Sequence, residues 1–289
     1  MAYRRQFYKV KLFLILLTSL ASGNAHSFWI FGGHDDITEE ALRSTYGKLS
    51  NGHEVYFSDR AIDEIWYWNR ATDTAEALNK PIYHFDDESF GKSSQRLLDG
   101  KNALISYLQK DKSKGENAWK HLGILLHTLQ DFYAHSTWVE QGNATIDTRL
   151  GVQALTWLTP NAIGNVCDKP DADNVNYLSI TASDITTGYF PQPDSCDFSE
   201  IVTLNKCAHG SLLYIPSVRG CAGLNKDYFG RKNFDKAKEL AIDATIDYVN
   251  QIFNELEKAN NDLAICKLVG VGVGKGNKTN RDECHVGAP

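Results

Sequence analysis

The stretch of sequence that decides the fold is HLGILLHTLQDFYAHSTWVE, residues 121–140. Its apolar residues recur at intervals of three and four, the spacing that places side chains on one face of an α-helix. That face comprises Leu122, Leu125, Leu126, Leu129, Phe132 and Tyr133. The pattern predicts a long helix over residues 116–140, with a broad apolar face that must pack against other elements.

A polar stripe runs along the same predicted helix. His127, Asp131 and His135 follow one another at intervals of four residues, and at about 100° per residue such positions drift by only about 40° per step. Imidazole nitrogens and carboxylate oxygens are zinc ligands, so the stripe indicates a metal site. A polar surface stripe, or buried histidines satisfied by hydrogen bonds, is the alternative. His121 points elsewhere and is interpreted as structural.

Periodic apolar residues predict further helices on both sides of this stretch. They cover residues 35–49, 58–78 and 92–109, a short segment at 145–158, and a long amphipathic segment at 232–258. Residues 160–230 lack the periodicity and hold most of the prolines and cysteines. We therefore expect a mainly α-helical fold, with a single domain over residues 28–289 and a loop-rich, disulfide-linked insertion at 160–230.

Six cysteines lie in the second half of the chain, and their even number predicts three disulfides in an exported protein. The local pairing of Cys266 with Cys284 is favoured, because it would fix a Gly-rich tail that we expect to be irregular or a short strand. No CxxC spacing occurs, which argues against a thiolate metal site.

The first 27 residues have the pattern of a secretory signal peptide. Basic residues from Arg4 to Lys11 precede an apolar run and a group of small residues that ends at Ser27. Cleavage near Ser27 removes four basic residues and no acidic one, so the net charge changes from −6 to −10. That charge disfavours nucleic acid as a partner, and the leader predicts a secreted or periplasmic protein. An uncleaved membrane anchor is the alternative.

Three other places supply residue types that bind metals. His34 lies close to the expected cleavage point, Asp73 lies late in the second predicted helix, and His84 lies in PIYHFDDESF beside an acidic run. Together with the stripe they provide five or six nitrogen and oxygen ligands, which is too many for one tetrahedral zinc. The sequence therefore predicts two or three clustered metals with a bridging carboxylate, an arrangement typical of phosphoester hydrolysis.

Four motifs carry a resemblance to a known family. They are GHDDIT at residues 33–38, YHFDDE at 83–88, LHTLQDFYAHS at 126–136 with the following WVE at 138–140, and GLNKD at 223–227. These motifs resemble the zinc-dependent phospholipase C superfamily, and most closely its bacterial branch that is similar to the fungal heterokaryon-incompatibility protein Het-C.

The resemblance implies a helical fold that holds two or three zinc ions. It assigns one ion to Asp73, His84, His127 and Asp131. It assigns a second ion to the amino group of the mature N-terminal residue, Phe28, together with His34 and a bridging Asp131.

A third ion is implied at His135, with Glu140, His209 and Asp227 as candidate partners. The better-known members of the superfamily space these helix ligands as HxxxDxxxxxH, whereas this chain has HxxxDxxxH and lacks a following HxxxE pair. Asp73 and Asp131 are the expected catalytic residues. Asp73 would accept a proton from water, and Asp131 would bridge two ions.

The function implied by the resemblance is that of a secreted zinc-dependent phospholipase C. It would use metal-activated water to hydrolyse phosphatidylcholine-type glycerophospholipids to diacylglycerol and a phosphorylated head group. Its partners would be the phospholipid and a membrane or micelle surface, with no stable nucleic-acid partner. Two alternatives stay open: a zinc-dependent nuclease or nucleotidase of the same fold, and a non-enzymatic Het-C-like toxin or incompatibility protein.

Overall fold

The structure is a computed structural model. It describes residues 33–74, 77, 80–156, 167, 184–189, 206–210, 223–227, 229–270 and 284. The expected signal peptide at residues 1–27, Phe28, most of the loop-rich segment at 160–230 and most of the Gly-rich tail lie outside the described residues.

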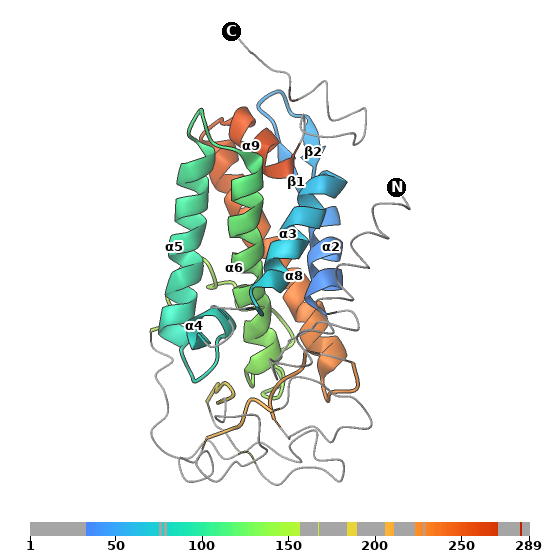
Figure 1. The fold of residues 1–289 in the computed structure, drawn as a ribbon, viewed down its shortest axis with the longest axis vertical. Helices are drawn as coiled ribbons and strands as arrows, with labels where there is room; N and C mark the ends of the chain where they lie inside the picture. Colours follow the sequence, from blue (N-terminus) through green and yellow to red (C-terminus); the bar gives the residue numbers. More distant parts are fainter. Residues whose placement is uncertain are drawn as a thin grey trace.

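The described part of the chain is built mainly from helices, and the longer ones run roughly along one long axis (Figure 1). The helices are α2 (His34–Arg43), α3 (Asp59–Ala71), α4 (Pro81–His84), α5 (Phe90–Leu108), α6 (Gly115–His135), α8 (Phe234–Lys258) and α9 (Asp262–Val269). Strands β1 (Tyr46–Lys48) and β2 (Glu54–Tyr56) form an antiparallel hairpin in which Tyr46 faces Tyr56. The prediction of a mainly helical fold is confirmed.

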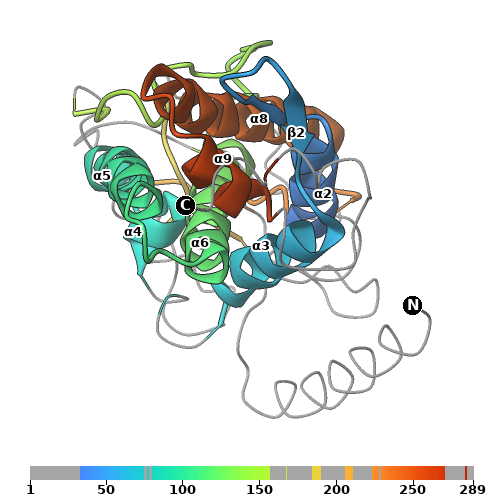
Figure 2. The ribbon, with the colours of Figure 1, turned by 90° about the horizontal axis from the view of Figure 1, so that it is seen from above.

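Helix α6 lies between α3 and α5 and also packs against α8 (Figure 2). Its apolar residues are buried as the sequence predicted, with Leu122 and Leu126 fully covered. Each such leucine contributes about 1.5–3 kcal/mol of transfer free energy. Near the start of α6, the indole nitrogen of Trp119 donates a hydrogen bond of 2.8 Å to the carbonyl of Leu268. This bond ties α9 to the bundle.

Helices α3 and α6 approach each other closely at Gly123. A Cβ atom built there would lie 2.3 Å from the carbonyl oxygen of Ile65 and 2.8 Å from the amide nitrogen of Asn69. Only a residue without a side chain permits this contact. The contact places the C-terminal end of α3 beside the polar stripe of α6.

Several predicted boundaries differ from those in the structure. The helix expected over 35–49 ends at Arg43, because Tyr46–Lys48 pairs with the second strand of the hairpin. The helix expected over 58–78 ends at Ala71. The helix expected over 116–140 ends at His135, because Ser136 is extended and pairs with Thr187.

Two further segments also differ from the prediction. The described part of the segment at 145–158 forms turns and no helix. The segment Asp262–Val269 forms α9, which the sequence analysis did not anticipate. Asn261 caps α9 at its N-terminus by accepting the amide of Ala264, and Gly270 ends it in a left-handed conformation with φ of 79°.

Two disulfides join described residues. Cys266–Cys284 confirms the favoured local pairing, and Cys167–Cys207 lies in the loop-rich segment. Cys196 and Cys221 lie outside the described residues. Within the part of the chain that the structure describes, no helix has the length and apolar character needed to cross a membrane.

Substituting Gly123 by alanine is expected to destabilise the protein by about 1–3 kcal/mol, because the added methyl group must push α3 away from α6. The matched control is Gly91→Ala in α5, where the nearest atom to a new Cβ lies 3.8 Å away. That change should be neutral or stabilise by up to about 1 kcal/mol. Urea unfolding at fixed zinc concentration measures both, and equal midpoints for the two variants would contradict the close α3–α6 contact.

Candidate metal centre

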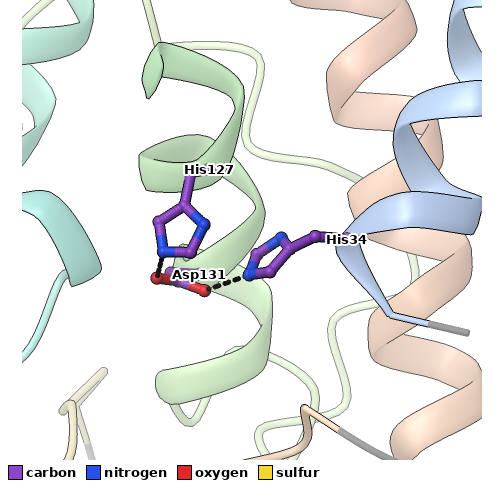
Figure 3. A group of neighbouring side chains, drawn as sticks. All are labelled: His34, His127 and Asp131. Atoms are coloured by element: carbon purple, nitrogen blue, oxygen red, sulfur yellow. Dashed lines mark ion pairs between the residues drawn. The ribbon is translucent and has the colours of Figure 1, made fainter. Parts of the chain in front are cut away.

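The polar stripe of α6 lies inside the protein. His127 and Asp131 are fully buried and His135 is 1% exposed. Figure 3 shows the Asp131 carboxylate between His127, one turn earlier on the same helix, and His34, which reaches in from the start of α2. The two carboxylate oxygens of Asp131 face different partners, and this divides the site into groups.

The first group surrounds Oδ2 of Asp131. His84 Nδ1 lies 2.9 Å and His127 Nε2 lies 3.0 Å from that oxygen, and the two nitrogens are 3.0 Å apart. Asp73 Oδ1 lies 3.2 Å from His127 Nε2 and 3.8 Å from His84 Nδ1. Asp73 lies just after α3, and it offers a ligand atom within 4.8 Å of those of His84 on α4 and His127 on α6. Asp131 Oδ2 adjoins the same two histidines.

The second group faces Oδ1 of Asp131. His34 Nε2 lies 3.1 Å from this oxygen (Figure 3). His34, His127 and Asp131 together offer ligand atoms within 4.8 Å of one another. The expected fourth contributor, the amino group of Phe28, lies outside the described residues.

The third group surrounds His135 at the C-terminal end of α6. His135 Nε2 lies 3.1 Å from both carboxylate oxygens of Asp227, 3.3 Å from His209 Nε2 and 3.8 Å from Oδ1 of Asp131. His135 Nδ1 lies 3.1 Å from Asp86 Oδ1. We call these nine residues the His–Asp cluster: His34, Asp73, His84, Asp86, His127, Asp131, His135, His209 and Asp227.

Backbone hydrogen bonds bring the distant segments to the end of α6. The amide of Gly188 donates to the carbonyl of His135, and the amide of Lys226 donates to the carbonyl of Ala134. The amide of Asn225 donates to the carbonyl of His209, so the segments 206–210 and 223–227 lie against each other. A Cβ at Gly223 would lie 2.0 Å from the His209 carbonyl oxygen, which shows how closely these segments pack.

Asp86 belongs to the cluster because of an unusual turn after α4. Phe85, Asp87 and Glu88 all have positive φ angles, of 56°, 52° and 53°. Such backbone costs on the order of 1 kcal/mol or more per residue and persists only where surrounding contacts hold it. The buried Glu88 carboxylate supplies these contacts by accepting hydrogen bonds from Thr186 and Lys206. The turn leaves the Asp86 side chain facing His135.

The structure brings together most of the predicted site residues, namely His34, Asp73, His84, His127, Asp131, His135 and His209. Glu140 is not among them. Its carboxylate pairs with Lys226 at 3.2 Å and accepts a hydrogen bond from Asn233. Asp227, weighed as a candidate, joins the third group, whereas exposed His121 lies outside the cluster.

Asp86 is the member of the His–Asp cluster that the sequence analysis did not predict as a candidate ligand. It was noted only as part of an acidic run beside His84. Its position two residues after the candidate ligand His84 could have indicated a role in the site. An acidic run in a turn is usually solvated, however, and this made the position uninformative. The positive φ angles that turn it inward do not follow from a local pattern.

The donor atoms fit zinc in two respects. Zinc binds imidazole nitrogen and carboxylate oxygen at about 2.0–2.2 Å, so two ligand atoms of a tetrahedral site lie about 3.3–3.5 Å apart. The contacts that His84 and His127 make in the first group, at 2.9–3.8 Å, span this spacing. Among the described residues, both oxygens of Asp86 and Oδ1 of Asp131 are buried and lack a well-aligned hydrogen-bond donor, although His135 Nδ1 lies 3.1 Å from Asp86 Oδ1 and His34 Nε2 lies 3.1 Å from Asp131 Oδ1. Buried carboxylate oxygens need a cation or a donor, and a metal ion would supply the cation.

Burial and neighbouring carboxylates shift the pKa values of the histidines in the cluster. Burial lowers the pKa of His127, but the charges of Asp131 and Asp73 outweigh it and raise the pKa to about 10. In His135, burial is likewise outweighed by Asp227, Asp131 and Asp86, and its pKa lies well above the ordinary value. Burial, together with the charge on His135, holds the pKa of His209 well below that value.

Fold and site together define a helical protein with a buried cluster of histidines and aspartates able to hold several metal ions. The chain belongs to the VWA7 N-terminal domain family, whose model matches residues 37–261. All cluster residues except His34 lie within that range.

Two curated relatives show the extent of the similarity. Human von Willebrand factor A domain-containing protein 7 is 30% identical over 181 residues, covering 58% of this chain and 18% of the human protein. The mouse protein of the same name is 27% identical over 231 residues, covering 73% of this chain and 23% of the mouse protein. The chain thus spans about a fifth of the length of these relatives. No solved structure matches.

These relatives correct the functional assignment made from sequence. The conclusion that the chain is a secreted, zinc-dependent phospholipase C hydrolase is wrong, because the family model and the curated relatives are those of VWA7 N-terminal domain proteins. The physical reason is that the histidine and aspartate motifs specify where ligand atoms lie, not which substrate reaches them. The wider superfamily resemblance, the assignment as an enzyme, the bound zinc, the expected partners and the secreted or periplasmic location stay predictions.

Zinc binding to this cluster is expected to release protons. At pH 7 the raised pKa values keep His127 and His135 protonated in the metal-free protein. Both must lose a proton to bind zinc, so zinc affinity should rise as pH increases from 6 to 8. Calorimetric titration of zinc in buffers of different ionisation enthalpy measures the protons released, and release of none at pH 7 would contradict the account.

Proposed function

We propose that this chain is a zinc-binding domain whose buried His–Asp cluster holds two or three ions and thereby fixes the helices and loops around it. The observation that carries the proposal is the Asp131 carboxylate. Its Oδ2 faces His84 and His127, whereas its Oδ1 faces His34 and His135. A carboxylate placed in this way is suited to bridge two ions.

The donor set favours zinc over other common metals. The cluster offers imidazole nitrogens and carboxylate oxygens and no thiolate. Calcium and magnesium prefer an all-oxygen shell, whereas imidazole suits zinc and the neighbouring transition metals. Mixed histidine and aspartate sites of four ligands are typical of zinc.

The first group supports a role in holding the fold. Asp73, His84 and His127 offer ligand atoms within 4.8 Å of one another, and Asp131 Oδ2, which contacts both histidines, would be the fourth ligand. All four residues are at most 3% exposed. Sites in which protein ligands fill all four positions are typical of structural zinc, whereas catalytic zinc keeps one position for water. An ion at this point would fix the end of α3 and the short helix α4 against α6.

The third group would attach the loop-rich segment to the same helix. His209 and Asp227 come from segments that contain little regular structure of their own. Because unfolding scatters these ligands, the binding free energy of zinc adds to the stability of the folded state.

Replacing Asp131 by asparagine is expected to remove more than one zinc ion per chain, because a neutral amide cannot bridge two cations. The matched control is Glu140→Gln, which alters a predicted ligand that instead pairs with Lys226. That variant should keep the wild-type zinc content. Elemental analysis after gel filtration measures both, and unchanged zinc in Asp131→Asn would refute the bridging role.

A chelator is expected to lower the melting temperature. At a zinc concentration 100 times the dissociation constant, one bound ion contributes about 2.7 kcal/mol. For a domain of this size that corresponds to a shift of about 5–10 °C. In thermal melts Asp131→Asn should show a much smaller response to chelator than Glu140→Gln. Equal responses in the two variants would mean that zinc acts elsewhere.

A further inference from the structure

The residue that precedes Asp131 is the hub of a buried hydrogen-bond network. The Gln130 side chain is fully buried and contacts residues of α2, α3 and α8. Its Oε1 lies 2.6 Å from His34 Nδ1 and accepts from Asn69 Nδ2 at 3.0 Å. Its Nε2 lies 3.2 Å from the hydroxyls of both Thr38 and Thr245.

The direction of these bonds is set by Thr245 on α8. The Thr245 hydroxyl has one proton, which it donates to the carbonyl of Ala241 at 2.7 Å. Toward Gln130 the same hydroxyl can then only accept. The side-chain group of Gln130 that faces Thr245 must therefore be the NH₂, and its oxygen must face His34.

The tautomer of His34 follows from the orientation of Gln130. An amide oxygen only accepts hydrogen bonds, so the proton of a neutral His34 must sit on Nδ1. The ring is then left with an unprotonated Nε2. That nitrogen lies 3.1 Å from Oδ1 of Asp131, on the cluster side.

The tautomer of His127 follows by one further step. Asn69 Nδ2 donates to Gln130 Oε1 and to Thr38 Oγ1, each at 3.0 Å, which uses both of its protons. The Asn69 oxygen therefore faces His127, and it lies 3.2 Å from Nδ1. Once neutral, His127 must also carry its proton on Nδ1 and present Nε2 to the cluster.

We propose that Asn69, Gln130 and Thr245 are positioning residues that select the Nδ1-protonated tautomer of His34 and His127, so that both bind metal through Nε2. This inference rests on the proposed zinc-binding function and adds the means by which two ligands are prepared for it. Hydrogen-bond partners of this kind orient ligand histidines and fix their tautomers in metal sites.

His84 provides an internal reference with the opposite tautomer. Its Nε2 lies 3.2 Å from the carbonyl oxygen of Ala77, which can only accept, and its Nδ1 faces Asp131 at 2.9 Å. In the zinc-loaded protein His84 should therefore be protonated on Nε2 and bind through Nδ1. The three histidines should give two different patterns within one site.

The test is a long-range proton–nitrogen NMR correlation of the zinc-loaded chain with ¹⁵N-labelled histidine, with zinc content measured on the same sample. The inference expects a protonated Nδ1 in His34 and His127 and a protonated Nε2 in His84. Zinc bound with His34 or His127 protonated on Nε2 would overturn the inference and leave the proposed function standing. Absence of bound zinc in the wild-type chain would overturn the proposed function itself, and the inference with it.

The variant Asn69→Asp should change the tautomer of His34 without changing that of His127. The variant keeps an acceptor oxygen for His127 but replaces the donor to Gln130 by an acceptor. This opposes the orientation set by Thr245 and favours rotation of the Gln130 amide, which would present its NH₂ to His34. The expected result is an unchanged His127, a His34 that is no longer protonated on Nδ1, and a zinc affinity about 10–100-fold weaker at the His34 position. A His34 signal unchanged from wild type would contradict the proposed relay.

Thr245→Val and Thr128→Val form a matched pair. Both threonines are buried and donate to the carbonyl four residues earlier in their own helix, but Thr128 has no described contact with Gln130. Thr245→Val should add a second set of His34 signals, whereas Thr128→Val should retain one. Identical His34 spectra in the two variants would show that Thr245 does not set the orientation.

Discussion

The Asp131 carboxylate, fully buried in the last turns of α6, is the constraint on which the rest of the structure depends. An isolated carboxylate in such a place costs far more free energy than a domain can supply, unless it is neutralised. Burial raises its pKa, but the neighbouring His127, His135 and His34 outweigh this and hold the pKa well below its usual value. The ionised carboxylate therefore needs positive charge close to both of its oxygens.

The surrounding fold places nitrogen ligands where that demand arises. Helix α6 supplies His127 and His135 one turn on either side of Asp131, and α2 and α4 supply His34 and His84. The glycine contact at Gly123 lets α3 approach closely enough for Asp73 and Asn69 to contribute. Backbone pairing at the end of α6 then brings in His209 and Asp227 from segments with little helix. Asp131 lies where these elements meet, and it contacts His34, His84, His127 and His135.

The sequence was sufficient where a local pattern carried the information. The spacing of His127, Asp131 and His135 predicted both the helix and the inward stripe, and the apolar period predicted the core face of α6. Those patterns depend only on helix geometry. Asp86, by contrast, depends on three positive φ angles stabilised by Thr186 and Lys206, and the extended Ser136 depends on its pairing with Thr187. Contacts between distant segments leave no local signal, which is why Glu140 was predicted as a ligand and Asp86 was not. The substrate assignment went wrong because ligand spacing carries no information about what reaches the site.

The most direct test of the central claim is the location of zinc by anomalous X-ray scattering, with crystals of the chain grown in zinc and data collected on both sides of the zinc absorption edge. The account predicts at least two anomalous peaks, one on each side of the Asp131 carboxylate. One of them should lie about 2.0–2.2 Å from Asp73 Oδ1, His84 Nδ1 and His127 Nε2. Zinc found only at surface carboxylates, with the Asp131 oxygens contacting protonated histidines alone, would contradict it.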